Sequence, residues 1–140
     1  MKHTTLTFTI ITPERVVFRA SVDSVSLNTA LGEVTILPQH MPLVGMVTPG
    51  EVRIHEGATE HHLATAGGYV QVRDGNEIVL LADAAERADE IDVARAEAAR
   101  SRAQELITQR SFANDIEFAA LQAALERSSV RIRVARRRRI

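Results

Sequence analysis

Three charged residues have the spacing and chemistry to bind a nucleotide. Asp92, Arg95 and Arg102 would lie on one face of a helix, and Glu86 comes shortly before it. Guanidinium groups pair with phosphate oxygens, and a carboxylate accepts hydrogen bonds from ribose or adenine donors. The same spacing also produces surface salt bridges, which are common on helices and need no ligand. On spacing alone, the salt bridge is favoured.

A second segment has the glycine spacing of a phosphate-binding loop. Gly45 and Gly50 match that spacing, but Glu51 and Val52 follow where the motif requires a lysine and a hydroxyl. An acidic side chain there would repel phosphate. We therefore expect an ordinary turn at residues 45–50.

Three histidines are metal ligands by type. His55, His61 and His62 flank a predicted hairpin turn at residues 56–60. Adjacent residues of a strand point to opposite faces, so His61 and His62 are not expected to face one metal ion. We predict no metal site here, and we expect no catalytic residues, because the sequence has no Ser/His/Asp or paired-carboxylate arrangement typical of an enzyme.

The composition excludes several classes of protein. The chain has 140 residues, 17 basic and 18 acidic side chains and no cysteine, which excludes disulfide scaffolds and cysteine chemistry. The longest charge-free stretch, residues 34–50, is interrupted by three prolines, so no membrane span is expected. Residues 1–12 alternate threonine with apolar residues and are expected to form a strand, not a signal peptide.

The chain divides into two parts of opposite charge. Every glycine and proline lies before residue 76, and the sequence then becomes rich in alanine, glutamate and arginine, which favours helices. Residues 1–86 have five basic and ten acidic side chains, whereas residues 87–140 have twelve and eight. The last fourteen residues include seven arginines, so we expect this terminus to meet an acidic partner or to stay solvated.

The first part has the alternation of half-buried strands. Apolar residues recur at every second position in several short segments, such as Leu6, Phe8 and Ile10. Turn signals separate these segments, and Asp74-Gly75 is a good hairpin candidate. Eight to ten short strands form a sandwich or flattened barrel. The predicted fold class is α+β, with an antiparallel β-sandwich at residues 1–86.

The second part, residues 87–140, is predicted to form an antiparallel hairpin of two helices. Asp89 is expected to cap the first helix, with Asp92 three positions later, and Asn114 with Glu117 resembles a second capping box after a turn at 108–114. The apolar stripes would include Val93, Ala96, Ala99, Ala103, Leu106 and Ile107, then Phe118, Leu121, Leu125 and Ile132. Such small faces bury little area, so we expect an arm that docks on the sandwich or moves to another subunit.

Five separated motifs from about Phe8 to Val134 resemble the epsilon subunit of bacterial F-type ATP synthase. They are Gly32–Leu43, Thr48-Pro49-Gly50, Ala66–Val70, Leu81–Ala88 and Ile91–Ala96. The sequence departs from that family at Thr35 and Gln39, where glycines are usual, and in its arginine-rich end.

The resemblance implies a non-catalytic subunit of the central stalk of a proton-translocating motor. A ten-stranded sandwich would lie between the gamma subunit and the ring of membrane c subunits, with Glu33, Pro38, His40 and Met41 at that interface. The helical arm would permit turnover when retracted and would inhibit ATP hydrolysis when extended toward the alpha and beta subunits. Arg131, Arg133, Arg136 and Arg137 would then meet an acidic loop of the beta subunit. The subunit would be peripheral, at the cytoplasmic face of the bacterial cell membrane.

The resemblance also favours the nucleotide hypothesis over the salt bridge. The implied site is Glu86, Ile91, Asp92, Arg95, Ala96, Arg102, Arg127 and Arg131. No cofactor would be required, and ATP would be a regulatory ligand that bridges the helices and holds the arm retracted.

Two alternatives belong to other functional classes. A free-standing sandwich could bind nucleic acid through its basic helical tail, and a small barrel could hold a metal enzyme built on its histidines. Nucleic acid is disfavoured because Lys2 is the only lysine, no aromatic residue follows Phe118, and the sandwich is net negative.

Overall fold

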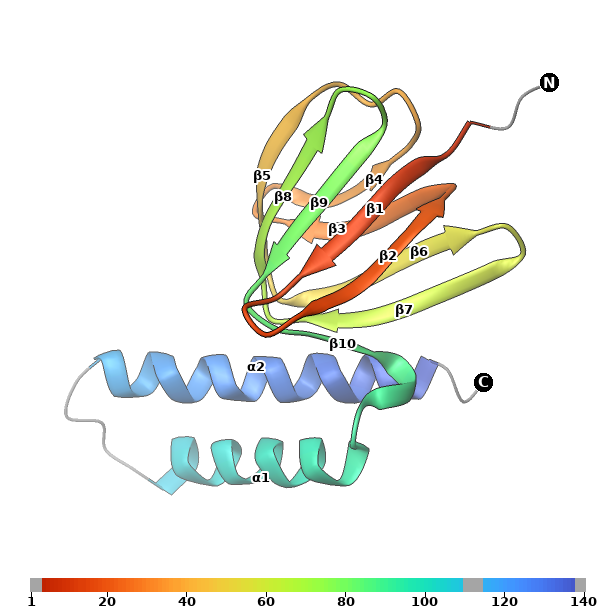
Figure 1. Ribbon diagram of the computed structural model, residues 1–140. Coiled ribbons are helices and arrows are strands. Elements are labelled where there is room, and N and C mark those ends of the chain that lie inside the picture. The colour runs from red at the N-terminus through yellow and green to blue at the C-terminus, as the bar shows by residue number, and fades with distance from the viewer. Residues whose placement is uncertain (1–3, 110–114, 138–140) are drawn as a thin grey trace.

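The computed structural model describes residues 4–109 and 115–137 and shows a β-sandwich with a helical arm beneath it (Figure 1). The strands are β1 (Leu6–Ile11), β2 (Val16–Val22), β3 (Ser24–Thr29), β4 (Gly32–Ile36), β5 (Leu43–Val47), β6 (Gly50–Glu56), β7 (Thr59–Thr65), β8 (Gly68–Arg73), β9 (Glu77–Ala82) and β10 (Ala85–Arg87). A 3₁₀ turn η1 (Ala88–Glu90) leads to α1 (Val93–Gln109) and α2 (Asp115–Arg137). The predicted α+β fold, a sandwich followed by a helical hairpin, is confirmed.

All ten strands belong to one sheet that folds over on itself. The hydrogen-bonded order is β10-β7-β6-β3-β5-β8-β9-β1-β2, and β4 pairs with β3. Neighbouring strands are antiparallel, except that β1 runs parallel to β9. The halves face each other in Figure 1, with the strands from β5 to β2 on one side and β3, β4, β6 and β7 on the other.

The core of the sandwich lies between these halves and follows the predicted alternation. Leu6, Phe8 and Ile10 are fully buried on β1, and each contributes about 1.5–3 kcal/mol by leaving water. The predicted hairpin at Asp74-Gly75 joins β8 to β9, where Gly75 and Asn76 both have positive φ, as a tight hairpin turn requires. At Gly68, φ is +150° and a side chain would collide with the carbonyl oxygen of Leu81, so only glycine fits there.

The first helix begins later than predicted, and its cap is Asp92 instead of Asp89. Asp89 lies in η1, and Ile91 is extended, so the helical backbone starts at Val93. Asp92 Oδ1 accepts a hydrogen bond of 3.0 Å from the backbone N–H of Arg95, which is the geometry of an N-cap. Asp89 does not cap the helix because this 3₁₀ turn and the extended Ile91 separate it from the first helical residue.

The predicted turn between the helices falls largely outside the described residues. Thr108 still belongs to α1, and its hydroxyl donates a 2.9 Å hydrogen bond to the carbonyl oxygen of Gln104. Gln109 is the last residue of α1, and residues 110–114 of the predicted turn, with the Asn114 cap, are not described by the structure.

The arm docks on the sandwich through α2, and α1 packs on the outer side of α2 (Figure 1). The predicted α1 stripe contributes the buried Ala96 and Ala103. A small apolar cluster, separate from the core of the sandwich, joins arm and sandwich through Ala64, Ile91, Val130, Val134 and Ala135. Because this cluster is small, the docking contact has limited hydrophobic stabilisation. Neither helix, over its described residues, is long and apolar enough to span a membrane.

Candidate functional site

A cavity of about 430 Å³ lies where the arm meets the sandwich. Four elements form it: the ends of β7 and β10 supply one wall, and α1 and α2 supply the other. Its lining includes Ala64, Thr65, Ala66, Ala84, Ala85, Glu86, Arg95, Ala99, Ala124, Arg127, Ser128, Val130 and Arg131. The many alanines leave room because their side chains are short, and the charged groups project into that room.

Four of the eight residues predicted to bind a nucleotide line this cavity. They are Glu86, Arg95, Arg127 and Arg131, which come from β10, α1 and α2. Three guanidinium groups and one carboxylate give the lining a formal charge of +2, which attracts an anion such as a phosphate chain.

The other four residues are not part of the cavity lining. Ile91 is buried in the small apolar cluster, Ala96 is fully buried on α1, and Asp92 caps that helix. Arg102 is exposed farther along α1. The contact that the structure shows between Asp92 and Arg95 is the cap, in which the Asp92 carboxylate accepts from the backbone N–H of Arg95.

A two-contact ion pair spans the cavity from the sandwich to the arm. Arg131 Nε lies 2.6 Å from Glu86 Oε1, and Arg131 Nη2 donates to Glu86 Oε2 at 3.2 Å. The two side chains are 26% and 35% exposed, so water screens this pair only partly. Glu86 therefore holds one of the three cavity arginines in the docked arm.

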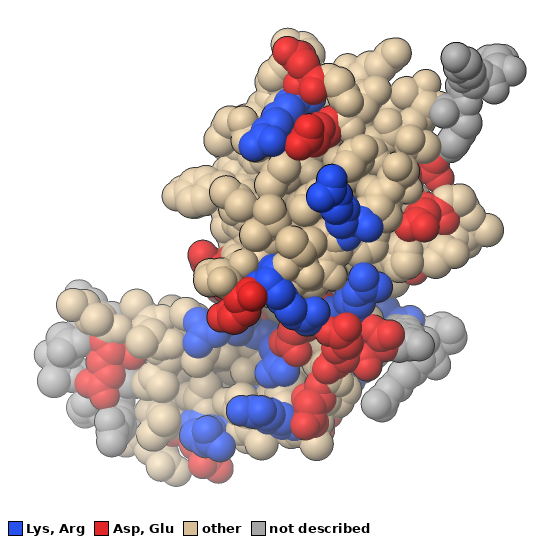
Figure 2. All heavy atoms as spheres, in the orientation of Figure 1, with Lys and Arg blue, Asp and Glu red and all other residues tan. Residues whose placement is uncertain are grey.

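The arginines predicted to meet an acidic partner are mostly paired within the chain. Arg131 pairs with Glu86, Arg136 lies 3.4 Å from Glu97 of α1, and Arg137 Nε lies 3.1 Å from Glu51 of β6. Arg133 is exposed. Figure 2 shows basic and acidic side chains gathered where arm and sandwich meet. The predicted arginines 138 and 139 lie outside the described residues.

The residues predicted at the stalk interface lie on β4 and in the segment that follows it. Glu33 on β4 pairs with Arg53 on β6. Pro38, His40 and Met41 follow β4 in an exposed segment, and Met41 is 77% exposed.

Gln39 shapes this segment with a backbone conformation that favours glycine. Its φ is +69°, and its backbone N–H donates a 2.6 Å hydrogen bond to Asn76 Oδ1. His40 Nδ1 lies 2.7 Å from the carbonyl oxygen of Met41. These contacts fix the turn that presents His40 and Met41 to solvent.

An exposed apolar stripe on the outer face of the sandwich was not predicted from the sequence. Met46, Tyr69 and Leu81 are each more than half exposed, and the strand register places them side by side on β5, β8 and β9. The strand pattern could have revealed this stripe, because apolar residues occupy outward-facing positions where polar residues are usual.

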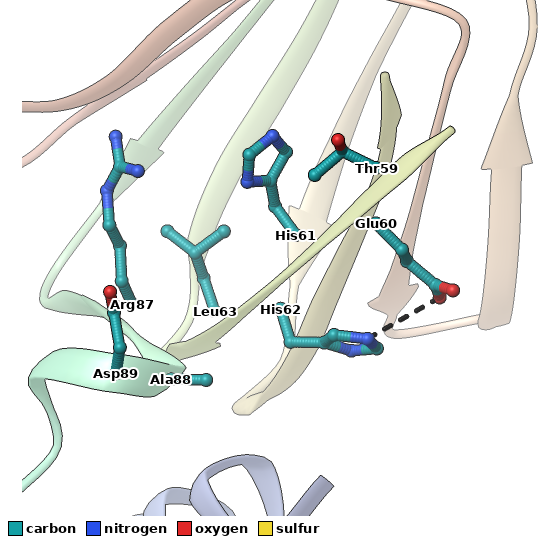
Figure 3. A pocket seen from close by; sticks show the side chains of 8 residues that line it. All are labelled: Thr59, Glu60, His61, His62, Leu63, Arg87, Ala88 and Asp89. Atoms are coloured by element: carbon teal, nitrogen blue, oxygen red, sulfur yellow. Dashed lines mark ion pairs between the residues drawn. The ribbon is translucent and has the colours of Figure 1, made fainter. Parts of the chain in front are cut away.

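The histidines lie as predicted on opposite faces of β7 (Figure 3). The His61 ring packs edge-on against Phe18, at 5.4 Å between centroids, whereas His62 lies between Glu51 and Glu60. Among the described residues, no group of three histidine, aspartate or glutamate side chains is placed to hold a metal ion.

Comparison with known proteins gives matches over nearly the whole chain. Residues 5–88 match the family model "ATP synthase, Delta/Epsilon chain, beta-sandwich domain", and residues 89–136 match the "long alpha-helix domain" of the same chain. The ATP synthase epsilon chain of Halalkalibacterium halodurans is 41% identical over 133 residues, which is 95% of this chain and 98% of that one. The epsilon chain of Herpetosiphon aurantiacus is 42% identical over 130 residues, 93% of each chain.

Solved structures show the same fold at low sequence identity. A chain in the Euglena gracilis mitochondrial ATP synthase, in an assembly of OSCP, F1 and c-ring, has a TM-score of 0.77 at 19% identity, over 89% of this chain and 78% of that one. A chain in the central stalk and c-ring of the Tetrahymena thermophila enzyme has a TM-score of 0.68 at 13% identity, over 96% and 99%.

Proposed function

This chain belongs to the ATP synthase delta/epsilon family as an epsilon-type subunit, and from this premise we propose that its helical arm regulates ATP hydrolysis. The sandwich couples the stalk to the c-ring, and the arm inhibits hydrolysis when it leaves the sandwich. The chain has no catalytic residue of its own in this proposal. It associates peripherally, through the complex, with the cytoplasmic face of the bacterial membrane.

The observation that supports a mobile arm is the small contact by which it docks. Five buried apolar residues join arm and sandwich, together with the ion pairs Glu86–Arg131 and Glu51–Arg137. Partly exposed ion pairs contribute little to stability, and the apolar cluster has only five buried members, two of them alanines. A contact of this size is sensitive to a ligand or partner that favours one position of the arm.

ATP is the proposed ligand of the cavity, and it favours the docked arm. Arg95 and Arg127 are available for phosphate oxygens, and Arg131 joins them when phosphate displaces Glu86. The Glu86 carboxylate then accepts hydrogen bonds from ribose or adenine donors. Because these side chains come from β10, α1 and α2, bound ATP would join all three elements. At 100 times its dissociation constant, a ligand stabilises the state it binds by about 2.7 kcal/mol.

The released arm exposes the arginines that the docked arm pairs internally. Arg131, Arg136 and Arg137 lose Glu86, Glu97 and Glu51 when the helices separate from the sandwich and from each other. With Arg133 they form a basic stretch of α2 suited to an acidic loop of the catalytic beta subunit. Inhibition would therefore weaken as salt screens these charges.

The sandwich residues have a separate proposed role in assembly. Glu33 on β4 and Pro38, His40 and Met41 in the segment after it contact the stalk and the c-ring in this proposal. The stripe of Met46, Tyr69 and Leu81 faces the gamma subunit, because burial against a partner would remove these apolar side chains from water.

The proposed regulation is tested by removing the arm. A chain that ends at Ala88 keeps all ten strands, and the complex reconstituted with it should hydrolyse ATP faster than the complex with the full chain. A cooperative thermal melt of the shortened chain controls for folding. Equal hydrolysis rates with a correctly assembled shortened chain would contradict inhibition by the arm.

A further inference from the structure

Four charged or titratable side chains meet at the contact between the end of the arm and the sandwich. This Glu51 cluster consists of Glu51 and Arg53 on β6, His62 on β7 and Arg137 in the last turn of α2. The Glu51 side chain is only 9% exposed, so these charges interact in a partly dehydrated environment. The proposed nucleotide cavity does not include these residues.

Two nitrogen atoms in the cluster approach the same carboxylate oxygen. Arg137 Nε lies 3.1 Å from Glu51 Oε2, and His62 Nδ1 lies 3.5 Å from that oxygen. Both Glu51 Oε2 and His62 Nδ1 are buried and have no hydrogen bond of good geometry within the described chain. The interaction between His62 and Glu51 therefore depends on whether the imidazole is charged.

We propose that His62 makes docking of the arm depend on pH: a proton on His62 weakens the contact of Arg137 with Glu51 and favours release of the arm. Imidazole is the side chain that ordinarily changes charge between pH 5 and 8. Neutral His62 leaves the Glu51 carboxylate to the two arginines. Protonated His62 places a third positive charge at a carboxylate of charge −1. This inference rests on the proposed function, because it requires that the arm can leave the sandwich.

The direction of the effect follows from which charges move with the arm. His62 Nε2 lies 3.6 Å from Glu60, whose carboxylate is also 3.9 Å from His55. Arg53 lies opposite His62 in the strand register. All of these groups belong to β6 and β7 and stay near His62 when the arm leaves.

Among the described residues of the arm, Arg137 is the charge that reaches the carboxylate shared with His62. Release removes Arg137, and with it the repulsion between its guanidinium group and a positive charge on His62. By linkage, the proton in turn favours release, and the docked state is weakened as pH falls.

Other charged groups lie on the elements packed against this strand. Asp89 of η1 lines the cavity of Figure 3 together with His62. On β10, Glu86 pairs with Arg131, and Arg87 lies over the Phe18 ring. A group of constant charge changes the coupling only if it moves relative to His62 when the arm leaves, and the groups on β7 and β10 stay with the sandwich. His61 lies on the opposite face of β7, 3.4 Å from Glu56, and serves as an internal control.

The test measures arm position in the full chain by fluorescence energy transfer. The chain has no cysteine, so Thr7→Cys on β1 and Ala120→Cys on α2, both exposed, can be labelled specifically. We expect the ratio of released to docked arm to rise about fivefold or more from pH 8 to pH 5.5. A factor of about five is the lower end of the range that is typical for coupling between two sites. His62→Gln should remove this rise, and His61→Gln should keep it.

A second variant protects the test against a folding defect in His62→Gln. Arg137 is half exposed at the end of α2, so Arg137→Gln leaves the sandwich intact. It should increase release at pH 8 and remove most of the pH dependence. An unchanged pH dependence in either His62→Gln or Arg137→Gln would overturn the role of the Glu51 cluster. If high salt releases the arm but pH does not, only this inference fails. An arm that stays docked at every pH and salt concentration overturns both the inference and the proposed mobility.

Discussion

Arg131 on α2 forms an ion pair with Glu86 on β10 through two contacts, 2.6 Å from Nε to Oε1 and 3.2 Å from Nη2 to Oε2. The two residues are 45 positions apart, and their contact closes one side of the cavity between arm and sandwich. The same pair thus stabilises the docked arm and occupies a guanidinium group that the proposed ligand would use. Docking and ligand binding are therefore expected to respond together when this pair is changed.

Arg95→Ala should weaken ATP binding without undocking the arm. The Arg95 side chain lines the cavity but forms no ion pair with another described residue, whereas Arg131 does. Loss of one charge-assisted hydrogen bond costs about 1.5–3 kcal/mol, which is a decrease in affinity of at least tenfold. Calorimetric titration of the full chain with ATP measures this change. Arg100→Ala, which removes an α1 arginine outside this cavity, is the matched control. Equal ATP affinities for Arg95→Ala and the parent would show that ATP does not bind in this cavity.

A double-mutant cycle on Glu86→Gln and Arg131→Gln should show coupling in docking of the arm. Each single change leaves its partner's charge in a partly buried position, and the double change removes both charges. We expect a coupling free energy of about 1 kcal/mol, since the pair is neither fully exposed nor fully buried. Energy transfer between labels at positions 7 and 120 gives the docked fraction. Additive effects of the two changes would show that the pair does not stabilise docking.

Asp92→Ala should destabilise the first turn of α1, and Asp89→Ala should not. Asp92 Oδ1 accepts the backbone hydrogen bond of an N-cap, and removal of such a cap costs about 0.5–2 kcal/mol. Asp89 precedes the helix in η1. Hydrogen exchange of the amides at the start of α1 should be faster only in Asp92→Ala. If exchange were faster in Asp89→Ala instead, Asp89 would be the N-cap, as the sequence predicted.

The sequence predicted the elements well because their signals are local. Alternation at Leu6, Phe8 and Ile10 defines β1, and the loss of glycine and proline after residue 76 marks the approach to the helical arm. The cap was wrong because Asp89 and Asp92 both precede the apolar stripe, and only the backbone shows that a 3₁₀ turn separates Asp89 from the helix.

The site was predicted only in part because its contacts are not local. Helical spacing grouped Asp92, Arg95 and Arg102, but the cavity combines Arg95 with Glu86 and Arg131 from other elements. The contact of Glu51 with Arg137 has no signal in sequence spacing, since it depends on where α2 docks on β6 and β7.

Tyr69→Glu should impair assembly of the subunit with its complex but leave its own fold intact. Tyr69 is 55% exposed and lies between Met46 and Leu81 in the strand register, so it contributes little to the core of the sandwich. A charge at the centre of a stripe buried by a partner would lose its hydration without compensation, which costs several kcal/mol. Ile116→Glu is the matched control, because Ile116 is an exposed apolar residue on the arm, outside the sandwich. Thermal melts of both variants should equal that of the parent, and reconstitution with the remaining subunits should fail only for Tyr69→Glu. Full assembly with Tyr69→Glu would show that this stripe stays in solvent and that another face of the sandwich contacts the stalk.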